Sequence, residues 1–357
     1  MRRSPTATIL LCCFFSLFVW SCHSAFAQQA PQANEKERGI ELYRKGNFSE
    51  AVEALKEAVK KQRKDSDAWY YLGLSLHRVG EIEAARKAFE KTISLRPDFA
   101  PGFTAWAYMQ LFSNDYKGAV KNAEKALALD PKNFESFYIV GTARLRQKQT
   151  AEALAKAEEA LKIKPDYSQA LILKTETLIS MFAREREKRI ESLGRRDKSK
   201  SSDDADDWAK EQSSYSLLKA ASESLEAYLK LKPEQSDHAF WSEQLEALRF
   251  YALSADDPVS DKPVTSTTTS SRPTILYREK ADYTKEARLA RVRGTVILMV
   301  VFANEGVLKH ILVLQGLSHG LTGQSIAAAR KIKFTPAMRD GKPTPVIGSL
   351  EFYFNLY

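Results

Sequence analysis

Beyond residue 27, the side chains best suited to catalysis or metal binding are four histidines: His77, His238, His310 and His319. A histidine can ligate a metal or move a proton, and both roles need a partner group nearby. None of the four has a glutamate or a second histidine at metal-ligand spacing, and GxSxG, Walker, GxGxxG and HExxH motifs are absent from the sequence. We therefore expect no enzyme activity, no catalytic residue, no metal site and no cofactor.

The amino-acid composition excludes further classes of protein. All three cysteines, Cys12, Cys13 and Cys22, lie at the N-terminus, so we expect no disulfide framework or cysteine nucleophile in the folded part. The 357 residues are 44% apolar and 28% charged, which fits two globular domains or a repeat array plus one domain. The net charge is +9, and residues from 274 onward hold 12 Lys and Arg against 6 Asp and Glu. We interpret this excess as a solvated surface and expect no nucleic-acid partner.

The first 27 residues have the pattern of a secretory signal. Arg2 and Arg3 precede an apolar run over residues 9–20, and residues 25–27 read Ala-Phe-Ala, a cleavage pattern. As a helix the run is roughly 18 Å long, shorter than a bilayer core of about 30 Å. We expect cleavage after Ala27 and a periplasmic or envelope location. A lipoprotein, from Val-Trp-Ser-Cys at residues 19–22, and an uncleaved membrane anchor stay open as alternatives.

A repeat organises the middle of the chain. Pro97, Pro131 and Pro165 are 34 residues apart, and alanines keep the same step. The positions in phase are Ala85, Ala119 and Ala153, and an earlier unit has Gly39, Ala51 and Leu55 at the same offsets. This pattern resembles the tetratricopeptide repeat, a helix–turn–helix unit. We therefore expect an all-α solenoid over residues 32–253, in which small residues let helices approach and prolines end them.

The fifth unit differs because it contains a charged insertion at residues 184–212. Opposite charges at helical spacing in its first part predict that both helices overrun the repeat before a polar tip. A last amphipathic helix over about residues 239–253 would cap the array with an apolar face. That face consists of Trp241, Leu245, Leu248 and Tyr251.

Residues of the first helix of each repeat that do not pack internally line a concave surface in such arrays. By register these candidates for partner binding are Tyr70, His77, Arg78, Thr104, Tyr108, Tyr138 and Arg146. Tyrosine, histidine and arginine suit peptide binding because they combine apolar area with a polar tip. The alternative is that the tyrosines fill gaps between successive repeats.

Residues 254–273 are rich in proline, threonine and serine without apolar periodicity, so we expect a flexible linker. Beyond it, residues 284–291 predict a short helix, and residues 295–302 and 307–314 predict a hairpin. A helix over residues 321–333 and a half-buried strand at the end of the chain follow. The order α-β-β-α-β predicts a small α+β domain over residues 274–357.

A second resemblance lies in this C-terminal part. Its motifs are Gly294-Thr295-Val296, Asn304-Glu305-Gly306, Phe334-Thr335-Pro336-Ala337, Asp340-Gly341-Lys342-Pro343 and Phe352-x-Phe354. They look like the C-terminal domain of the TonB family. The resemblance implies recognition by strand addition, in which an extended segment of an outer-membrane receptor pairs with a sheet edge. Carried over, the edge is residues 348–354, with Gly348, Leu350, Phe352 and Phe354 as candidates. The alternative is a strand that is covered or used for self-pairing.

Together these features predict a multidomain protein, an all-α tetratricopeptide solenoid followed by a small α+β TonB-like domain. The expected function is an exported envelope adaptor that binds proteins, TonB-dependent outer-membrane receptors among them, through its groove and its sheet edge. Two alternatives stay open. One is a genuine TonB-type energy transducer, which would need an anchor in place of the apparent cleavable signal. The other is an assembly factor that oligomerises through its C-terminal domain.

Overall fold

The computed structural model describes residues 34–195, 204–231, 235–253, 264–265 and 271–356. The expected signal, lipoprotein and anchor alternatives, the tip of the charged insertion and most of the expected linker lie outside these residues. The chain divides into two compact units between Pro97 and Asp98. Each unit is described by itself.

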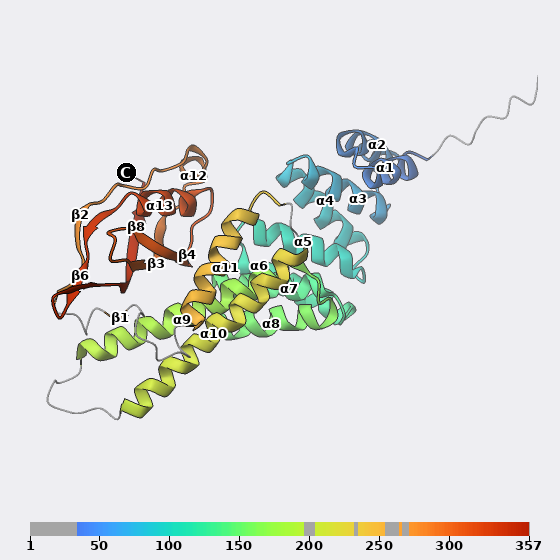
Figure 1. Ribbon diagram of the computed structural model, residues 1–357. Coiled ribbons are helices and arrows are strands. Elements are labelled where there is room, and N and C mark those ends of the chain that lie inside the picture. Colours follow the sequence, from blue (N-terminus) through green and yellow to red (C-terminus); the bar gives the residue numbers. More distant parts are fainter. Residues whose placement is uncertain (1–33, 196–203, 232–234, 254–263, 266–270, 357) are drawn as a thin grey trace, which may run out of the picture. The chain divides into compact units, whose positions relative to one another are not determined.

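Both units begin with antiparallel helix pairs, coloured blue to green in Figure 1. The first unit contains α1 (Glu35–Arg44), α2 (Phe48–Lys61), α3 (Ser66–Arg78) and α4 (Ile82–Leu95). The second unit begins with α5 (Ala100–Phe112), α6 (Tyr116–Leu129), α7 (Phe134–Arg146) and α8 (Thr150–Ile163). Helices α4, α6 and α8 end two residues before Pro97, Pro131 and Pro165, respectively, so the predicted repeat phase is confirmed.

Local residues explain where the first helices begin. The carboxylate of Asp65 accepts hydrogen bonds from the backbone N–H groups of Asp67 and Ala68 at the start of α3, at 3.1 and 3.0 Å. The side chain of Asn133 accepts one from Ser136 at the start of α7, at 2.9 Å. Such caps satisfy N–H groups that have no partner within the helix.

Small residues allow close packing between the helices of a pair. Ala51, Ala85, Ala119 and Ala153, which are 34 residues apart, are all fully buried. In the first unit, a Cβ added to Gly73 would lie 2.7 Å from the Phe89 ring, and the Phe89 side chain is only 1% exposed. Glycine at residue 73 is therefore a steric requirement of the packing of α3 against α4.

Replacing Gly73 by alanine is expected to destabilise the first unit by about 1–3 kcal/mol, because the buried Phe89 ring must move. Gly323→Ala is the control, since a Cβ there meets no atom within 4 Å. That substitution is expected to stabilise the protein by about 0.5–1 kcal/mol through helix propensity. Urea unfolding of the two variants measures both effects, and a gain in stability from Gly73→Ala would contradict this packing argument.

The last helices are longer than the earlier ones. Helix α9 spans Ser168–Arg195 and α10 spans Asp204–Leu231, so both extend into the charged insertion as predicted. Helix α11 spans His238–Leu253 and lies against α10, in the position of the expected cap. Its buried residues include Leu245, Leu248 and Tyr251.

The C-terminal part is a small α+β structure. Its elements are β1 (Val264–Thr265), β2 (Thr274–Tyr277), α12 (Lys285–Leu289), β3 (Gly294–Phe302), β4 (Leu308–Gln315), α13 (Leu321–Arg330), β5 (Lys333–Thr335), β6 (Ala337–Arg339), β7 (Lys342–Thr344) and β8 (Val346–Phe354). The predicted order α-β-β-α-β corresponds to α12, β3, β4, α13 and β8. The short strands β5, β6 and β7 are additional.

The main sheet has the strand order β1-β8-β3-β4. Strand β3 pairs antiparallel with β4 and with β8, whose nine residues run in register from Gly294 opposite Phe354 to Phe302 opposite Val346. Strand β1 pairs parallel with the start of β8. Two stretches of the expected linker thus have partners in the structure: Val264–Thr265 with β8, and Ser271 with Met338.

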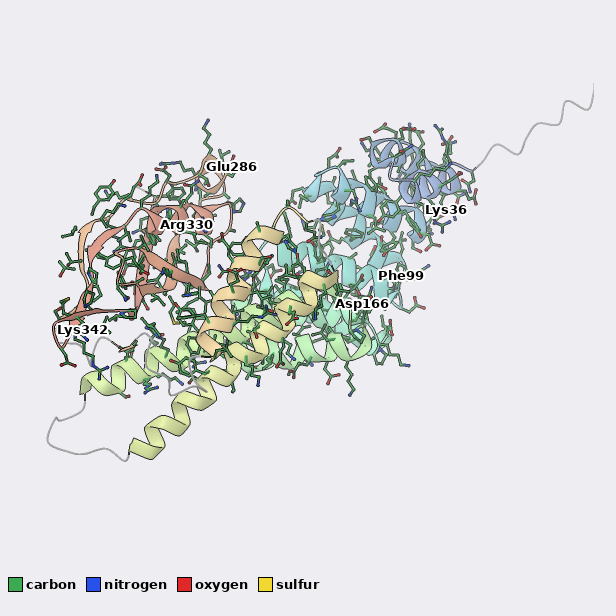
Figure 2. The ribbon with its side chains drawn as sticks, viewed as in Figure 1. Lys36, Phe99, Asp166, Glu286, Arg330 and Lys342 are labelled. Atoms are coloured by element: carbon green, nitrogen blue, oxygen red, sulfur yellow. The ribbon has the colours of Figure 1, made fainter. Side chains whose placement is uncertain are left out.

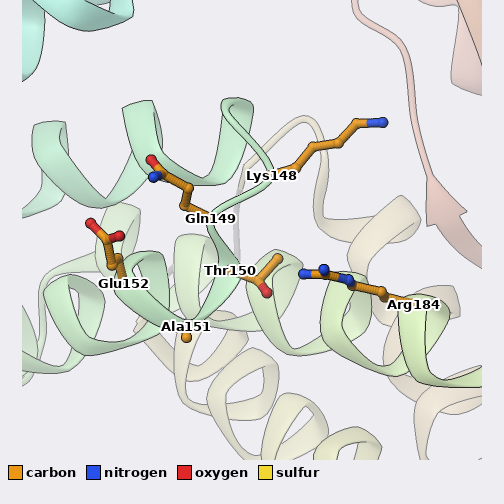
Figure 3. A pocket seen from close by; sticks show the side chains of 6 residues that line it. All are labelled: Lys148, Gln149, Thr150, Ala151, Glu152 and Arg184. Atoms are coloured by element: carbon orange, nitrogen blue, oxygen red, sulfur yellow. The ribbon is translucent and has the colours of Figure 1, made fainter.

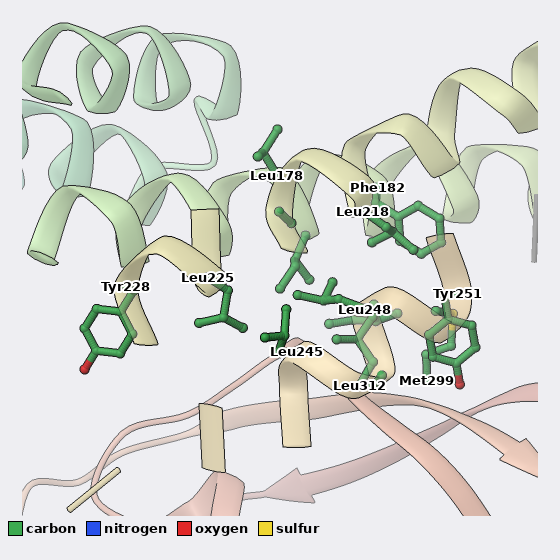
Figure 4. Close-up of a cluster of buried hydrophobic side chains, with 14 of the residues drawn as sticks. Leu178, Phe182, Leu218, Leu225, Tyr228, Leu245, Leu248, Tyr251, Met299 and Leu312 are labelled. Atoms are coloured by element: carbon green, nitrogen blue, oxygen red, sulfur yellow. The ribbon is translucent and has the colours of Figure 1, made fainter. Parts of the chain in front are cut away.

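Strand β3 is buried on both faces of the sheet. Val296, Leu298 and Val300 pack in a core with α13 and β8, whereas Met299 and Val301 pack in a second core with helices α9 to α11. Figure 4 shows this second core, where Met299 and Leu312 from the sheet meet Leu248 and Tyr251 from α11. The sheet is therefore packed on the end of the repeat array, and two-sided burial explains the continuous apolar run in β3.

Candidate functional site

In the first unit, the predicted groove residues lie along α3. Tyr70 and His77 are partly buried, and the Tyr70 ring contacts the rings of Tyr71 and Phe89. Arg78 is exposed, with its guanidinium carbon 4.1 Å from the centre of the Phe48 ring. Burial, followed by the charge of Arg78, lowers the pKa of His77. These side chains combine aromatic area with polar tips on one helix.

In the second unit, the remaining predicted groove residues come from α5 and α7. Tyr108 is 40% exposed, and Arg146 lies 3.9 Å from the carboxylate of Glu176 on α9. Burial raises the pKa of Tyr138, and Tyr108 and Glu176 raise it further while Arg146 lowers it. Tyr108 and Arg146 are exposed, and Tyr138 and Glu176 are half-buried, so all four side chains keep some contact with solvent.

Tyr138 also packs against Tyr167, which lies between two repeats. The Tyr138 ring meets the Tyr167 ring edge-on at 5.7 Å, and Tyr167 meets Phe134 at 4.9 Å. Thr104 differs from the expectation because it is buried, and its hydroxyl lies 2.9 Å from that of Ser136. Thr104 therefore ties α5 to α7 instead of lining the surface.

The predicted sheet edge is the outer side of β8. Leu350, Phe352 and Phe354 are buried in the core on the α13 face of the sheet, and a Cβ at Gly348 would lie 2.6 Å from the Phe302 ring. These four candidates therefore pack inside the domain. Ser349, Glu351 and Tyr353 alternate with them, and their side chains are exposed on the opposite face.

The backbone of β8 has an inner and an outer side. The inner side of β8 pairs with β3. On the other, outer side, Arg278 donates a hydrogen bond to the carbonyl oxygen of Glu351. Because N–H and C=O groups of alternate residues face the same side of a strand, those of Ser349, Glu351 and Tyr353 face outward. Strand β1 covers only Val346 and Ile347. In the described residues, the outer side of β8 beyond Ile347 has no strand partner.

The opposite edge of the sheet is covered by α11. The side-chain amide of Gln244, which is 2% exposed, accepts a hydrogen bond from the N–H of Val313 at 2.9 Å and donates one to the carbonyl oxygen of Ile311 at 3.2 Å. The hydroxyl of Tyr251 donates to the carbonyl oxygen of His310 at 2.8 Å. Arg330 on α13 (Figure 2) pairs with Glu243 at 2.6 Å. The bonds of Gln244 and Tyr251 satisfy backbone groups of β4 that would otherwise face a free edge, and the Arg330–Glu243 pair adds a contact between α13 and α11.

His310 forms a titratable part of this contact. Its ring stacks on Phe250 with 3.6 Å between ring centres, and its backbone is left-handed at a bulge in β4, with φ of 49°. Burial, followed by the charge of Lys309, lowers the pKa of His310, while Glu246 opposes the shift. The folded protein therefore favours the neutral ring.

We expect a pH dependence of stability from His310. Because its folded pKa lies below the unfolded value of about 6.5, its contribution is complete above that pH and is lost as pH falls through the folded pKa. His310→Asn tolerates the left-handed backbone and does not titrate, so it is expected to flatten the dependence below about pH 6.5. Urea unfolding of both proteins between pH 7 and pH 5 measures the change. Parallel curves for the two proteins would contradict this assignment.

Catalysis would require a pocket, and metal binding would require a group of ligand side chains. A pocket of about 340 Å³ is lined by Lys148, Gln149, Thr150, Ala151, Glu152 and Arg184 (Figure 3). Its lining includes one carboxylate and no histidine or cysteine. Within the described part of the chain, no three histidine, cysteine, aspartate or glutamate side chains are grouped to hold a metal ion. No described helix is long and apolar enough to cross a membrane.

The geometry defines a class of protein: a helical-repeat array that ends in a small α+β domain with a sheet edge that is partly without a strand partner among the described residues. The chain matches the Tetratricopeptide repeat family at residues 36–99 and 104–168. It matches the family described as Gram-negative bacterial TonB protein C-terminal at residues 279–356. Residues 36–168 thus contain tetratricopeptide repeats and residues 279–356 form a TonB-family C-terminal domain, as both resemblances implied.

Curated relatives match the repeats over a short length. The Hsp70-Hsp90 organizing protein of Triticum aestivum is 29% identical over 101 residues, which are 28% of this chain and 17% of that protein. Hsp70-Hsp90 organizing protein 2 of Arabidopsis thaliana is 30% identical over 101 residues, 28% of this chain and 18% of the relative. The chain thus spans less than a fifth of these relatives' length.

Among solved structures, PilW, a type IV pilus biogenesis factor, superposes with a TM-score of 0.47 at 17% identity, over 62% of this chain and 87% of PilW. The MamA protein superposes with a TM-score of 0.37 at 15% identity, over 58% of this chain and 92% of MamA.

Sequence reasoning missed Gln244, Glu176 and Tyr167. Gln244 lies four residues before Leu248, inside the apolar face of the predicted cap helix. A polar residue at such a position signals a buried hydrogen-bond partner. Tyr167 follows Pro165 and could have been recognised as a filler between repeats. Glu176 gave no comparable signal.

Proposed function

We propose that this protein is an exported adaptor of a Gram-negative-type cell envelope. Its repeats bind one protein partner. Its C-terminal domain receives an extended segment of a second protein, an outer-membrane receptor, along the outer side of β8. The proposal is supported most directly by the outward backbone groups of Ser349, Glu351 and Tyr353, which have no described strand partner. Main-chain hydrogen bonds would supply affinity and alternate side chains selectivity.

The surface around Tyr108, Tyr138, Arg146 and Glu176 supports a peptide partner for the repeats of the second unit. Aromatic side chains bury area at low entropic cost, and Arg146 and Glu176 are both partly exposed. Tetratricopeptide repeats and TonB C-terminal domains are interaction modules, and the family description of the second domain supports an envelope location.

The contacts of α11 with the sheet favour an adaptor over an assembly factor. The β4 edge is bonded to α11, and the face of Met299 and Leu312 is buried against the same helix. Among the described residues, a second copy of the chain that adds a strand to the main sheet would therefore have to do so on the β8 side. An energy transducer would use that side in the same way, so the two functions differ in the N-terminus and not in the binding contact.

Strand addition is tested by matched substitutions of Glu351 in the full chain. Glu351→Pro removes an outward N–H without removing a bond to β3, whereas Glu351→Ala keeps that N–H. With outer-membrane extract as the source, wild-type protein and Glu351→Ala are expected to retain receptors that Glu351→Pro binds at least about tenfold more weakly, or about 1.4 kcal/mol. Equal retention of those receptors by all three proteins, or retention by none, would contradict the proposal.

A further inference from the structure

The chain segment that precedes the C-terminal domain contacts β8 at two places. Val264 lies opposite Val346 and Thr265 opposite Ile347 in the parallel β1–β8 pair. Further along, Arg278 follows β2, donates to the carbonyl oxygen of Glu351 and lies with its guanidinium carbon 4.9 Å from the centre of the Phe352 ring. The same segment therefore reaches the start and the middle of the outer side of β8.

A third contact fixes the segment between these two places. The N–H of Ser271 donates to the carbonyl oxygen of Met338 at 3.2 Å, and the N–H of Met338 donates to the Ser271 hydroxyl at 3.0 Å. Strand β2 pairs with β5 from Thr274 opposite Thr335 to Tyr277 opposite Lys333. These contacts hold Arg278 within reach of Glu351.

Both contacts with β8 use its outward backbone groups. Ile347, Ser349 and Glu351 are alternate residues of one strand, so their N–H and C=O groups face the same side. Strand β1 pairs at Ile347 and Arg278 bonds Glu351, while Ser349 lies between them. Any partner strand that pairs along β8 through these positions must replace both contacts.

The contacts of β1 and Arg278 with β8 are few compared with those that a full partner strand would make. Strand β1 has two residues, and Arg278 supplies a side-chain donor instead of a backbone ladder. A partner that pairs from Ile347 to Tyr353 would form a longer ladder on the same side. The resident contacts are thus short enough to be exchanged for a partner strand, while they protect an edge that would otherwise invite unwanted pairing.

We propose that β1 and Arg278 form an autoinhibitory strap on the outer side of β8, which an incoming strand must displace. This proposal rests on the proposed strand addition for its biological role. Release of the strap exposes the outward groups of Ile347 and Glu351, and rebinding of the strap closes them.

The test uses the full chain with β1 changed in two ways. Val264→Pro/Thr265→Pro removes both N–H groups of β1, including the one that faces β8, and Val264→Ala/Thr265→Ala keeps them. Amide hydrogen exchange is followed at Ile347, which faces β1, and at Leu350, which faces β3. The proline variant is expected to exchange the Ile347 amide at least about tenfold faster than wild type and the alanine control, with Leu350 unchanged as evidence of an intact sheet.

A second measurement asks whether the released edge accepts a strand. The probe is a fluorescent synthetic peptide with the sequence of residues 260–268, followed by fluorescence anisotropy. The proline variant is expected to bind it with a Kd at least about tenfold lower than wild type or the alanine control, and adding Arg278→Ala is expected to lower the Kd further. An unchanged Ile347 exchange rate would overturn the strap, and so would equal peptide affinities.

Neither measurement involves a receptor, so the two proposals fail separately. If the strap behaves as expected but Glu351→Pro still retains receptors as wild type does, the edge is self-occupied and receptor addition there is wrong. If receptor binding depends on Glu351 while Ile347 exchange is insensitive to β1, strand addition stands and the strap is wrong.

Discussion

Replacing Leu248 by alanine is expected to destabilise the second unit by about 2–5 kcal/mol, because the buried side chain leaves a cavity in a packed core. Leu248 is fully buried in α11, in one core with Leu225 of α10 and with Met299 and Leu312 of the sheet. A cavity there weakens the helices and the sheet together. Amide exchange at Leu225 and at Val300 is therefore expected to accelerate in parallel.

Leu253→Ala is the control for this substitution, because Leu253 belongs to the same helix and is 68% exposed. Its effect on urea unfolding is expected to stay within about 0.5 kcal/mol. A core that joins the two parts would be contradicted if Leu248→Ala accelerated exchange in the helices and left the sheet unchanged.

Gln244→Leu is expected to destabilise the second unit by about 2 kcal/mol or more. Leucine has a similar volume, but it leaves the N–H of Val313 and the carbonyl oxygen of Ile311 without their partner. Each buried backbone group that loses a hydrogen bond costs about 1–3 kcal/mol. Urea unfolding measures the loss, which is expected to be nearly independent of pH.

Gln244→Glu provides a matched variant for the same contact. An ionised carboxylate can accept from Val313 but cannot donate to Ile311, and burial opposes its charge. Burial raises the pKa of such a carboxyl above its unfolded value, so its folded form is favoured at low pH. Stability of this variant relative to Gln244→Leu is therefore expected to rise as pH falls, because the protonated group can donate. No pH-dependent difference between the two variants would argue against the two-bond contact.

The repeat array was predictable because its signals have local steric causes. A proline that follows a helix and a glycine that faces an aromatic ring act within one repeat, so Pro97 and Gly73 are informative without knowledge of the rest of the fold. The order of the C-terminal elements was predictable from alternation and turn residues. Strands β5 to β7 have three residues each, too few for alternation to be distinctive.

Contacts between distant parts of the chain were not predictable in the same way. The apolar run of β3 indicated burial, but nothing in it identifies α11 as one of its two neighbours. At β8, alternation correctly separates Leu350 and Phe352 from Ser349 and Glu351. It does not say which set a partner would meet. In the structure, the side chains of the first set lie in the core, whereas the backbone N–H and C=O groups of the second set face the outer side of β8.

The core shared by α9, α10, α11 and the sheet has a consequence for inheritance and for protein engineering. A recombination event at residues 254–273 would separate the parts at the compositional boundary, yet it would leave the apolar surfaces of Leu248 and Met299 without each other. The exchangeable module that keeps the buried residues of this core together begins before α9, near Lys164, and runs through β8, although it loses the packing of Leu154 and Leu161 from α8. We expect substitutions at Gln244, Leu248, Met299 and Leu312 to change together among descendants of this chain, and chimeras joined before α9 to be more soluble than chimeras joined at residue 273.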